Sequence, residues 1–363
     1  MHHPSHASPP RHPHAAPQRG AAILLAMLIM VLVTTLVAGA VWRQSQILEM
    51  EAAERDRAQA DWVLNGLLDW ARIIIREDDR PSSSNPNPKR VDYLDEPWAK
   101  KLKASSLSTF LSLDKNDNGG RDTSDLSQAF FSGYFEDLNS RFNLPDLLAD
   151  DLSGYDPNYG PVFDRLCALV GVAPADRDAF KAAYLRAAQT EAGKAGTAAS
   201  TANSATGSTS GSTQDDTLLP ERIEQLSWLG ASSDTINKLS PYLVIFSPTR
   251  IDQPHLRQKI NVNTADATLL KAAIVGCDDN CAQQIRQLSL SPSIKGFDSP
   301  ASLFAQSAFS ALQAKNPNAP IDGKSQLFQV VGKLQIDKLQ VEETAVFWRP
   351  SVGDVRVYSR QRS

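Results

Sequence analysis

A twelve-residue polar stretch, Asp114–Asp125, is the part of the sequence best suited to metal chemistry. Its oxygen-bearing side chains follow the spacing of an EF-hand calcium loop, with Gly119 at the sixth position. The candidate ligands are Asp114, Asn116, Asn118, Asp122 and Asp125. The stretch departs from the pattern because its last position is Asp rather than Glu and no strong helix precedes it. The sequence therefore leaves two interpretations open, a calcium site and a polar surface turn.

The cysteines are the next candidates for chemistry. Cys277 and Cys281 lie four residues apart in the sequence GCDDNC, and Cys167 is the third. In the cytosol this spacing would suggest a metal or redox role, whereas outside the inner membrane a small structural disulfide is favoured. Such a bridge closes a short loop and mainly fixes local geometry. We expect this disulfide, with Cys167 as a buried thiol.

Catalytic patterns are lacking in the sequence. His255 is the one histidine that follows the first 20 residues, and it lies beside Pro254. No GxSxG, P-loop, GxGxxG or HExxH pattern occurs. Scattered carboxylates could meet in space, but their spacing does not define a pair. We therefore expect a protein that is not an enzyme.

Residues 260–290 resemble a helix-hairpin-helix module, a motif that binds the DNA backbone. Such modules need exposed amides and nearby positive charge. Here the turn between the helices reads GCDDN, and Lys271 is almost the only cation. The formal net charge of the chain is −4, so it has no basic field to attract phosphate. We expect a packing module with no nucleic-acid partner.

The composition of the whole chain is that of a globular protein with one membrane segment. The chain has 363 residues, of which 42% are hydrophobic and 21% charged. These values exclude a fully disordered chain, a collagen and a many-span membrane protein. The 22 residues Ala21–Trp42 carry no charge. As a helix they would be about 33 Å long, enough to cross a hydrocarbon core of about 30 Å.

The leader before this segment allows two interpretations. Residues 1–20 contain no Asp or Glu and end in Arg19-Gly20. A signal anchor or Sec signal peptide would be cut, if at all, after the apolar run, where Ala38-Gly39-Ala40 offers small residues. The alternative is cleavage between Gly20 and Ala21, which keeps the transmembrane helix. This arrangement resembles the class III signal of type IV pilins and type II secretion pseudopilins. The positive-inside rule places the leader in the cytoplasm and the rest outside.

The remaining sequence predicts a mixed fold. Apolar residues at three- and four-residue intervals extend the first helix to about residue 77, where prolines end it. A strand is expected at 129–138, helices at 159–188, and three antiparallel strands at 326–335, 339–348 and 352–358. Between them lie shorter helices at 222–229, 233–239, 265–274 and 280–288, the third capped by Thr264. The order predicts an α+β head with an inserted helical domain.

The predicted boundaries follow from this order. The leader is 1–20, and the N-terminal helix has a transmembrane half at 21–42 and a periplasmic half at 43–80. Two β regions, 81–150 and 321–363, enclose a helical domain at 151–320. Within that domain, Ala, Gly, Ser and Thr make up 20 of the 22 residues 192–213. This composition predicts a flexible linker, which we place at 190–217.

Several short motifs resemble the type II secretion system protein K family, which consists of minor pseudopilins. The most specific are RFNL at 141–144 and INVNTA at 260–265, which occur in the family's order and spacing. The others are the leader boundary RGAAILL at 19–25, YLDEPWA at 93–99, LSPYL at 239–243 and SQLFQV at 325–330. The resemblance covers almost the whole mature chain. The acidic insert and the 190–217 linker depart from it as loop expansions.

The resemblance implies a pilin-like fold, in which the long N-terminal helix packs on an antiparallel sheet and the insertion is SAM-like. It implies that prepilin peptidase cuts after Gly20 and methylates Ala21, and that calcium sites occur in the head. Most pilins have a glutamate at the fifth mature position, and the K subunit is the pseudopilin type that lacks it. Leu25 occupies that position here.

The resemblance also implies a non-enzymatic subunit at the tip of the pseudopilus. Its partners would be the minor pseudopilins I and J, together with H and the major pseudopilin G. The protein would cross the inner membrane once, with its head in the periplasm. Two alternatives remain, a minor pilin of a type IV pilus or DNA-uptake system, and a membrane-anchored periplasmic enzyme.

Overall fold

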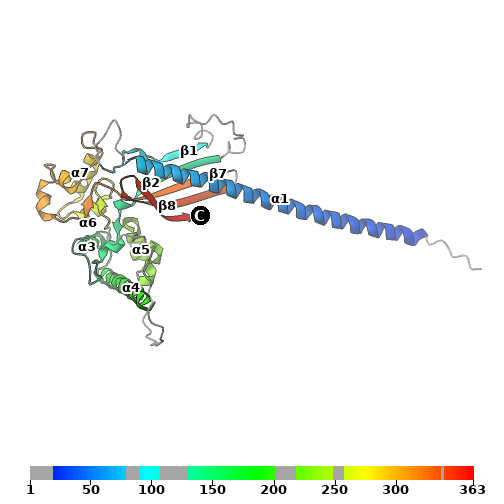
Figure 1. Ribbon diagram of the computed structural model, residues 1–363, viewed down its shortest axis with the longest axis horizontal. Coiled ribbons are helices and arrows are strands. Elements are labelled where there is room, and N and C mark those ends of the chain that lie inside the picture. Colours follow the sequence, from blue (N-terminus) through cyan, green and yellow to red (C-terminus); the bar gives the residue numbers. More distant parts are fainter. Residues whose placement is uncertain (1–18, 79–89, 107–128, 202–217, 248–256, 337–338) are drawn as a thin grey trace, which may run out of the picture. The chain divides into compact units, whose positions relative to one another are not determined.

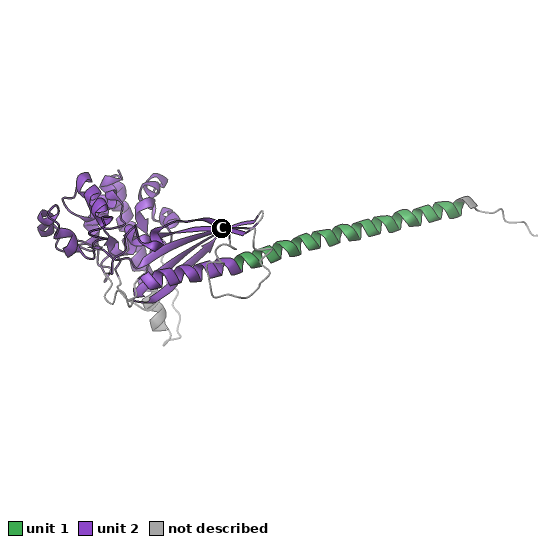
Figure 2. Ribbon diagram, turned by 90° about the horizontal axis from the view of Figure 1, so that it is seen from above, with its two compact units in different colours: residues 1–61 green, residues 62–363 purple. Residues whose placement is uncertain are grey.

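A computed structural model describes residues 19–78, 90–106, 129–201, 218–247, 257–336 and 339–363 (Figure 1). The chain divides into two compact units, residues 1–61 and 62–363 (Figure 2). One helix, α1 (Arg19–Asp78), contributes residues to both. Its described length agrees with the helix predicted over residues 21–77, because a single apolar periodicity runs through it without Pro.

A five-stranded antiparallel sheet forms the β part of the second unit. Its order is β1-β2-β7-β8-β9, so the two C-terminal hairpins extend a pair of strands from the first half of the chain. The strands are β1 (Leu102–Ser106), β2 (Ala129–Asp137), β7 (Leu327–Ile336), β8 (Leu339–Ser351) and β9 (Asp354–Arg362). β2 pairs with β7 over its whole length, from Ala129 opposite Ile336 to Asp137 opposite Phe328. The helical region is therefore inserted between two neighbouring strands.

The C-terminal part of α1 packs on one face of this sheet (Figure 1). Its buried side chains Leu68, Ala71 and Ile75 contact sheet residues Phe328 and Phe347. The indole of Trp98, from the 3₁₀ turn η1 (Pro97–Ala99), meets the ring of Phe328 edge-on at 5.2 Å. These three residues are three and four positions apart, so they lie on one face of the helix. This apolar face makes the C-terminal half of α1 amphipathic.

The inserted region has its own, larger core. Phe142, Phe163, Phe180 and Tyr184 form a chain of ring contacts through it. Its α-helices are α3 (Tyr159–Leu169), α4 (Pro174–Thr201), α5 (Ser233–Leu239), α6 (Ala267–Ala273), α7 (Asp279–Ser289) and α8 (Pro300–Phe304). Its 3₁₀ turns are η3 (Leu138–Ser140), η4 (Leu144–Leu147), η5 (Ile223–Leu229), η6 (Ser240–Tyr242) and η8 (Ser310–Lys315).

Two short pairs of parallel strands join segments of the inserted region that are far apart in the sequence. β3 (Phe142–Asn143) pairs with β4 (Leu243–Val244), and β5 (Ile260–Asn261) pairs with β6 (Ile321–Asp322). The RFNL motif thus meets the LSPYL motif, and the INVNTA motif meets the segment just before β7. RFNL and INVNTA, the two motifs with the most specific family spacing, each contribute one strand to these short parallel pairs.

The structure corrects two predictions about helix boundaries. Part of the 190–217 linker is helical, because α4 continues to Thr201, and residues 202–217 lie outside the described residues. Alanine has the highest helix propensity, so an Ala-rich extension of a packed helix needs no further apolar burial. Thr264 is not the cap of the following helix. The carboxylate of Asp266 accepts the Thr268 N–H at 2.8 Å and caps α6 instead.

A glycine substitution should test how closely the inserted region packs beside the sheet. A Cβ atom built on buried Gly323 would lie 1.6 Å from the carbonyl oxygen of Phe297, a backbone atom that has no rotamer to change. We expect Gly323→Ala to lower the free energy of unfolding by about 3 kcal/mol, measured by urea denaturation of the full chain in detergent micelles. Gly66→Ala on α1 is the control. Nothing lies within 4 Å of its Cβ position, so it should stabilise by about 0.5–1 kcal/mol. Equal effects of the two changes would contradict the packing described.

Candidate functional site

The first unit presents an apolar helix surface. Between Ile23 and Trp42 the large apolar side chains of α1 expose 49–70% of their area. The best 18-residue window has a mean hydropathy of 2.8, and none of it is buried. The hydroxyls of Thr34 and Thr35 donate to backbone carbonyls one turn earlier, so their polar hydrogens have partners within the helix. These features fit a single-pass membrane anchor.

The predicted processing residues lie at the beginning of this helix. α1 begins at Arg19, so Gly20 and Ala21 are its second and third residues. Leu25 follows one turn later and is 59% exposed. An apolar side chain at this position keeps the first turns of the helix free of buried charge, which a bilayer strongly disfavours.

The second unit contains a buried polar network between the end of β2 and the INVNTA motif. Asn261, fully buried, donates its side-chain amide to the Asp137 carboxylate at 3.0 Å, to the Asp92 carbonyl at 2.9 Å and to the Ser325 hydroxyl at 2.7 Å. The hydroxyls of Ser325 and Thr264 both donate to Asp137. Burial raises the pKa of Asp137 to about 6, and the hydroxyl donors oppose this rise. We call these five residues, with Asn139 and Asn263, the junction.

Two further asparagines of the junction bind mainly backbone groups. The Asn139 side-chain oxygen accepts the N–H groups of Gln326 and Leu327 at 2.8 and 2.9 Å, where β7 begins. Asn263 accepts the Phe297 N–H at 2.8 Å and donates to its carbonyl at 2.9 Å. A buried side-chain amide satisfies a donor and an acceptor at once, which explains why Asn is used here.

The RFNL motif builds a second set of such bonds. The Asn143 amide accepts the Phe246 N–H at 2.8 Å and donates to the Phe246 carbonyl at 3.0 Å. It also donates to Asp146 at 3.0 Å, and Asp146 accepts the Gln258 N–H at 2.8 Å. Burial raises the pKa of Asp146 to about 7. Arg141, on the partly exposed side of the motif, forms an ion pair with Glu136.

A cluster of carboxylates lies next to the junction, where α1 ends. One carboxylate oxygen each from Asp78, Asp92 and Glu96 lies within 4.8 Å of the other two. The Arg349 guanidinium, from β8, binds both oxygens of Asp92 at 2.6 and 2.8 Å and reaches Asp78 at 3.3 Å. It also donates to the Ser325 carbonyl at 2.8 Å, so it links this acidic cluster to the junction.

Burial holds protons on two members of the acidic cluster. It raises the pKa of Asp78 to about 7, assisted by the charge of Asp92 and opposed by that of Arg349. It raises the pKa of Glu96 to about 8, assisted by Asp78, although the Trp98 indole N–H donates to Glu96 at 2.7 Å. The cluster can therefore take up or release protons near neutral pH.

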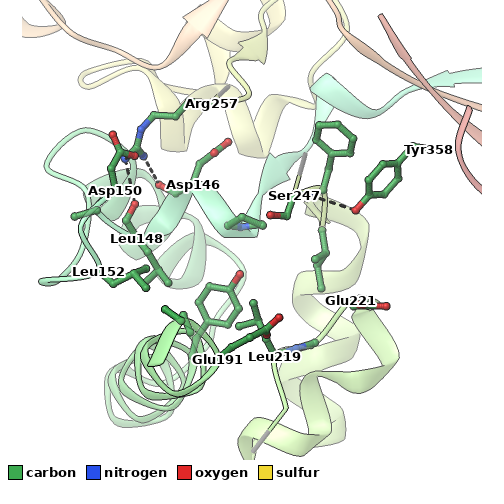
Figure 3. Close-up of a pocket in the computed structure, with 18 residues that line it drawn as sticks. Asp146, Leu148, Asp150, Leu152, Glu191, Leu219, Glu221, Ser247, Arg257 and Tyr358 are labelled. Carbon is green, nitrogen blue, oxygen red and sulfur yellow. Dashed lines mark hydrogen bonds and ion pairs between the residues drawn. The ribbon is translucent and has the colours of Figure 1, made fainter. Parts of the chain in front are cut away.

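A hollow of about 420 Å³ lies between the inserted region and the edge strand β9 (Figure 3). Leu148 and Leu152 line one side, and Tyr358 of β9 accepts the Ser247 N–H at 3.4 Å on the other. Arg257 donates to Asp150 and to the carbonyl of Leu148. Sequence reasoning did not identify this hollow, because its walls come from six separate segments of the chain.

The remaining predicted residues have simpler positions. Cys277 and Cys281, the predicted pair, form a disulfide in the turn between α6 and α7. Cys167 is a buried thiol of α3, and burial raises its pKa to about 12. The Lys271 ammonium pairs with Asp279 at 2.6 Å, so its charge is used within the chain. The predicted calcium ligands Asp114, Asn116, Asn118, Asp122 and Asp125, and also His255, lie outside the described residues.

Sequence reasoning identified the motifs of the junction but not the acidic cluster. The YLDEPWA stretch contains Glu96 and Trp98, yet nothing in its spacing points to Asp78 or Arg349. Arg349 and Asp92 are 257 residues apart. The one available signal was the charge of Arg349 directly after the apolar run Ala345–Trp348 of β8.

Comparison with known proteins supports this architecture in two steps. The fold is similar to a chain in the crystal structure of the GspK-GspI-GspJ complex from the type 2 secretion system of enterotoxigenic Escherichia coli. That match has a TM-score of 0.56 and 14% identity, and covers 86% of this chain and 98% of the other. A family model of type II secretion system protein K matches residues 140–248. The predicted resemblance to protein K is thereby confirmed, and so is the α+β fold. No curated protein matches the sequence.

The raised pKa values predict how stability depends on pH. Asp78 and Glu96 bind protons more tightly in the folded chain than in the unfolded chain, where their pKa values are 3.8 and 4.5. Their contribution to stability is therefore complete below about pH 4 and is lost as the pH rises to about 8. We expect the free energy of unfolding to fall across this range, and Glu96→Gln to flatten the slope. Glu224→Gln, at an exposed position, should leave the slope unaltered. A wild-type free energy of unfolding that does not change with pH over this range would contradict the raised pKa values of Asp78 and Glu96.

Removal of the Arg349 cation should be costly. Arg349→Met leaves the buried carboxylates without this counter-charge, and such a loss typically lowers stability by about 3–5 kcal/mol. Arg356→Met on the exposed edge strand is the matched control, with an expected change below about 0.5 kcal/mol. The double variant Asp92→Asn/Arg349→Met should lose less than the two single losses together, because the changes remove one shared interaction. Additive losses in urea denaturation would show that the pair does not act as a unit.

Proposed function

We propose that this chain is a minor pseudopilin of a type II secretion system, a structural subunit rather than an enzyme. The observation that carries the proposal is the family match over residues 140–248, which begins beside the RFNL motif and ends just after Phe246. Those residues form the β3–β4 ladder and the Asn143 amide bonds. The match therefore falls on the residues that determine the fold of the inserted region, and not on a short isolated motif.

The proposed site of action is the tip of the pseudopilus, in the periplasm. Prepilin peptidase would cut after Gly20 and methylate Ala21, which leaves α1 anchored in the inner membrane with its N-terminus at the cytoplasmic side. In a pilin-like fibre the fifth-position glutamate neutralises the terminal amine of a neighbouring subunit. Leu25 cannot do this, and a subunit with no neighbour above it has no need to. The subunit would start or cap the fibre that exports folded proteins.

The proposed partners are the minor pseudopilins I and J, with H and the major pseudopilin G in the same fibre. The support is the similar fold of a chain from a complex whose name includes GspI and GspJ. We expect the full chain, expressed in membranes with the I and J pseudopilins of the same bacterium, to co-purify with both in a fixed ratio. A tagged single-pass membrane protein of unrelated fold is the control. Loss of the complex, together with normal secretion in a deletion strain, would overturn the proposal.

The same experiment separates the alternatives. A minor pilin of a type IV pilus or DNA-uptake system would instead co-purify with pilus subunits, and its deletion would affect DNA uptake or pili rather than secretion. A membrane-anchored enzyme would form neither complex.

Calcium binding at the Asp114–Asp125 stretch is a further part of the proposal. A ligand that binds only the folded chain stabilises it by about 2.7 kcal/mol at a concentration 100 times its Kd. We expect calcium to raise the Tm of the full chain relative to EGTA, and Asp114→Asn/Asp122→Asn to abolish the rise. Magnesium serves as the control ion. An unchanged Tm with calcium would exclude a calcium site that stabilises the fold.

A further inference from the structure

The charge-free segment of α1 ends at a residue of a different kind. Trp42 is the only aromatic residue in the sequence between positions 21 and 61, and Arg43 directly after it is the first charged residue of that stretch. The Trp42 side chain is exposed, with 65% of its area accessible. Aliphatic, aromatic and cationic side chains thus follow one another within three positions, which indicates a boundary between two surroundings.

The polar side chains of the segment differ in where their hydrogen bonds go. Residues 21–42 contain two hydroxyl groups and one indole N–H as their only side-chain donors. The Thr34 hydroxyl donates to the Met30 carbonyl and the Thr35 hydroxyl to the Leu32 carbonyl, both at 2.9 Å. The Trp42 indole N–H lies at the far edge of a rigid ring, and no acceptor bonds to it among the described residues. Its acceptor must therefore come from outside the helix.

This donor restricts how deeply Trp42 can lie in a bilayer. Hydrocarbon offers no acceptor, and burial of a polar group without a hydrogen bond costs about 1–3 kcal/mol. The headgroup layer supplies ester and phosphate oxygens, while the body of the ring stays in contact with the acyl chains. The Arg43 guanidinium needs the same layer, because a charge in the hydrocarbon core is strongly disfavoured.

The charged residues that follow set a limit from the other side. Six of the nine residues 49–57 are charged, so the hydrocarbon must end before Glu49. Trp42 precedes Glu49 by seven residues, which is about 10 Å of helix. A headgroup layer of about 5–8 Å fits between them. Both limits therefore place Trp42 where the hydrocarbon meets the headgroups.

The length of the segment places its other end at the opposite face of the bilayer. The 22 residues from Ala21 to Trp42 span about 33 Å as a helix, and the hydrocarbon core is about 30 Å thick. With Trp42 in one headgroup layer, Ala21 reaches the other. The amine that leader cleavage would create on Ala21 would then face lipid phosphates, and Leu25 would lie in the hydrocarbon.

We propose that Trp42 is an interfacial anchor, which binds the phospholipid headgroup layer at this end of the segment and holds α1 at one depth. The indole N–H donates to a lipid oxygen, and the ring lies on the upper acyl chains. Lipid is the occupant because the large apolar side chains from Ile23 to Trp42 are all exposed, and a bilayer covers every side of a helix at once. The inference rests on the proposed membrane anchor and adds the residue that sets its depth.

The test measures the depth of the Trp42 ring in phospholipid vesicles that contain the full chain. The probes are phosphatidylcholines with bromine, a contact quencher of tryptophan fluorescence, near either the headgroup end or the methyl end of the acyl chains. The Trp42 signal is the difference between the wild type and Trp42→Phe. We expect bromine near the headgroup end to quench this signal at least twofold more strongly than bromine near the methyl end.

Two variants calibrate the measurement. Leu36→Trp/Trp42→Phe moves the ring six positions toward the middle of the segment and should reverse the order of quenching. Trp62, which follows the charged run 49–57 and is 80% exposed, is the matched control. The difference signal between the wild type and Trp62→Phe should be quenched by neither lipid.

The possible outcomes separate this inference from the proposed function. Stronger quenching of the Trp42 signal from the methyl end would overturn the inference, because the ring would then lie in the hydrocarbon. Quenching of the Leu36→Trp ring but not of Trp42 would also overturn it, since Trp42 would lie in water or against protein. If neither ring is quenched and alkaline carbonate extracts the chain, the membrane anchor itself is wrong, and this inference fails with it.

Discussion

The fully buried side-chain amide of Asn261 bonds simultaneously to Asp137 at the end of β2, to Ser325 just before β7, and to the backbone of Asp92. The sheet and the inserted region meet through this amide. The chain leaves the sheet after β2, builds the whole inserted region, and returns to pair β7 with the same strand. Every polar group brought into this crossing must find a partner there, because an unmet buried donor costs about 1–3 kcal/mol. Arg349 extends the bonding to Asp92 and the end of α1.

This constraint explains why polar residues fill the two most specific motifs. Asn139, Asn143, Asn261 and Asn263 each bind backbone groups of distant segments. Aspartate would supply acceptors only, and an apolar residue would leave the backbone groups unpaired. The raised pKa values of Asp137 and Asp146 follow from the same burial. Within the part of the chain that the structure describes, these motifs build the fold and do not form an exposed reactive site.

Much of the fold could be predicted from the sequence because it follows local periodicity. The apolar stripe of α1, the strand at 129–137 and the three C-terminal strands needed no tertiary information. The helical end of α4 was missed because composition alone does not distinguish an Ala-rich linker from a helix supported by packing. The cap of α6 was misplaced because Thr264 and Asp266 both suit that role locally, and Asp137 engages Thr264 only in three dimensions. Sequence spacing could not reveal the acidic cluster or the hollow beside β9, since both are assembled from distant segments.

The central claim is that the junction makes the sheet and the inserted region one cooperative unit. Native-state hydrogen exchange of the full chain in nanodiscs tests it directly, by comparing the slowest amides of β7 and β8 with those of α6 and α7. The account predicts the same opening free energy for both sets, and Asn261→Ala should lower both by the same amount. If the helices open at a clearly smaller free energy while the strands stay protected, or if Asn261→Ala affects only one set, the junction does not couple them.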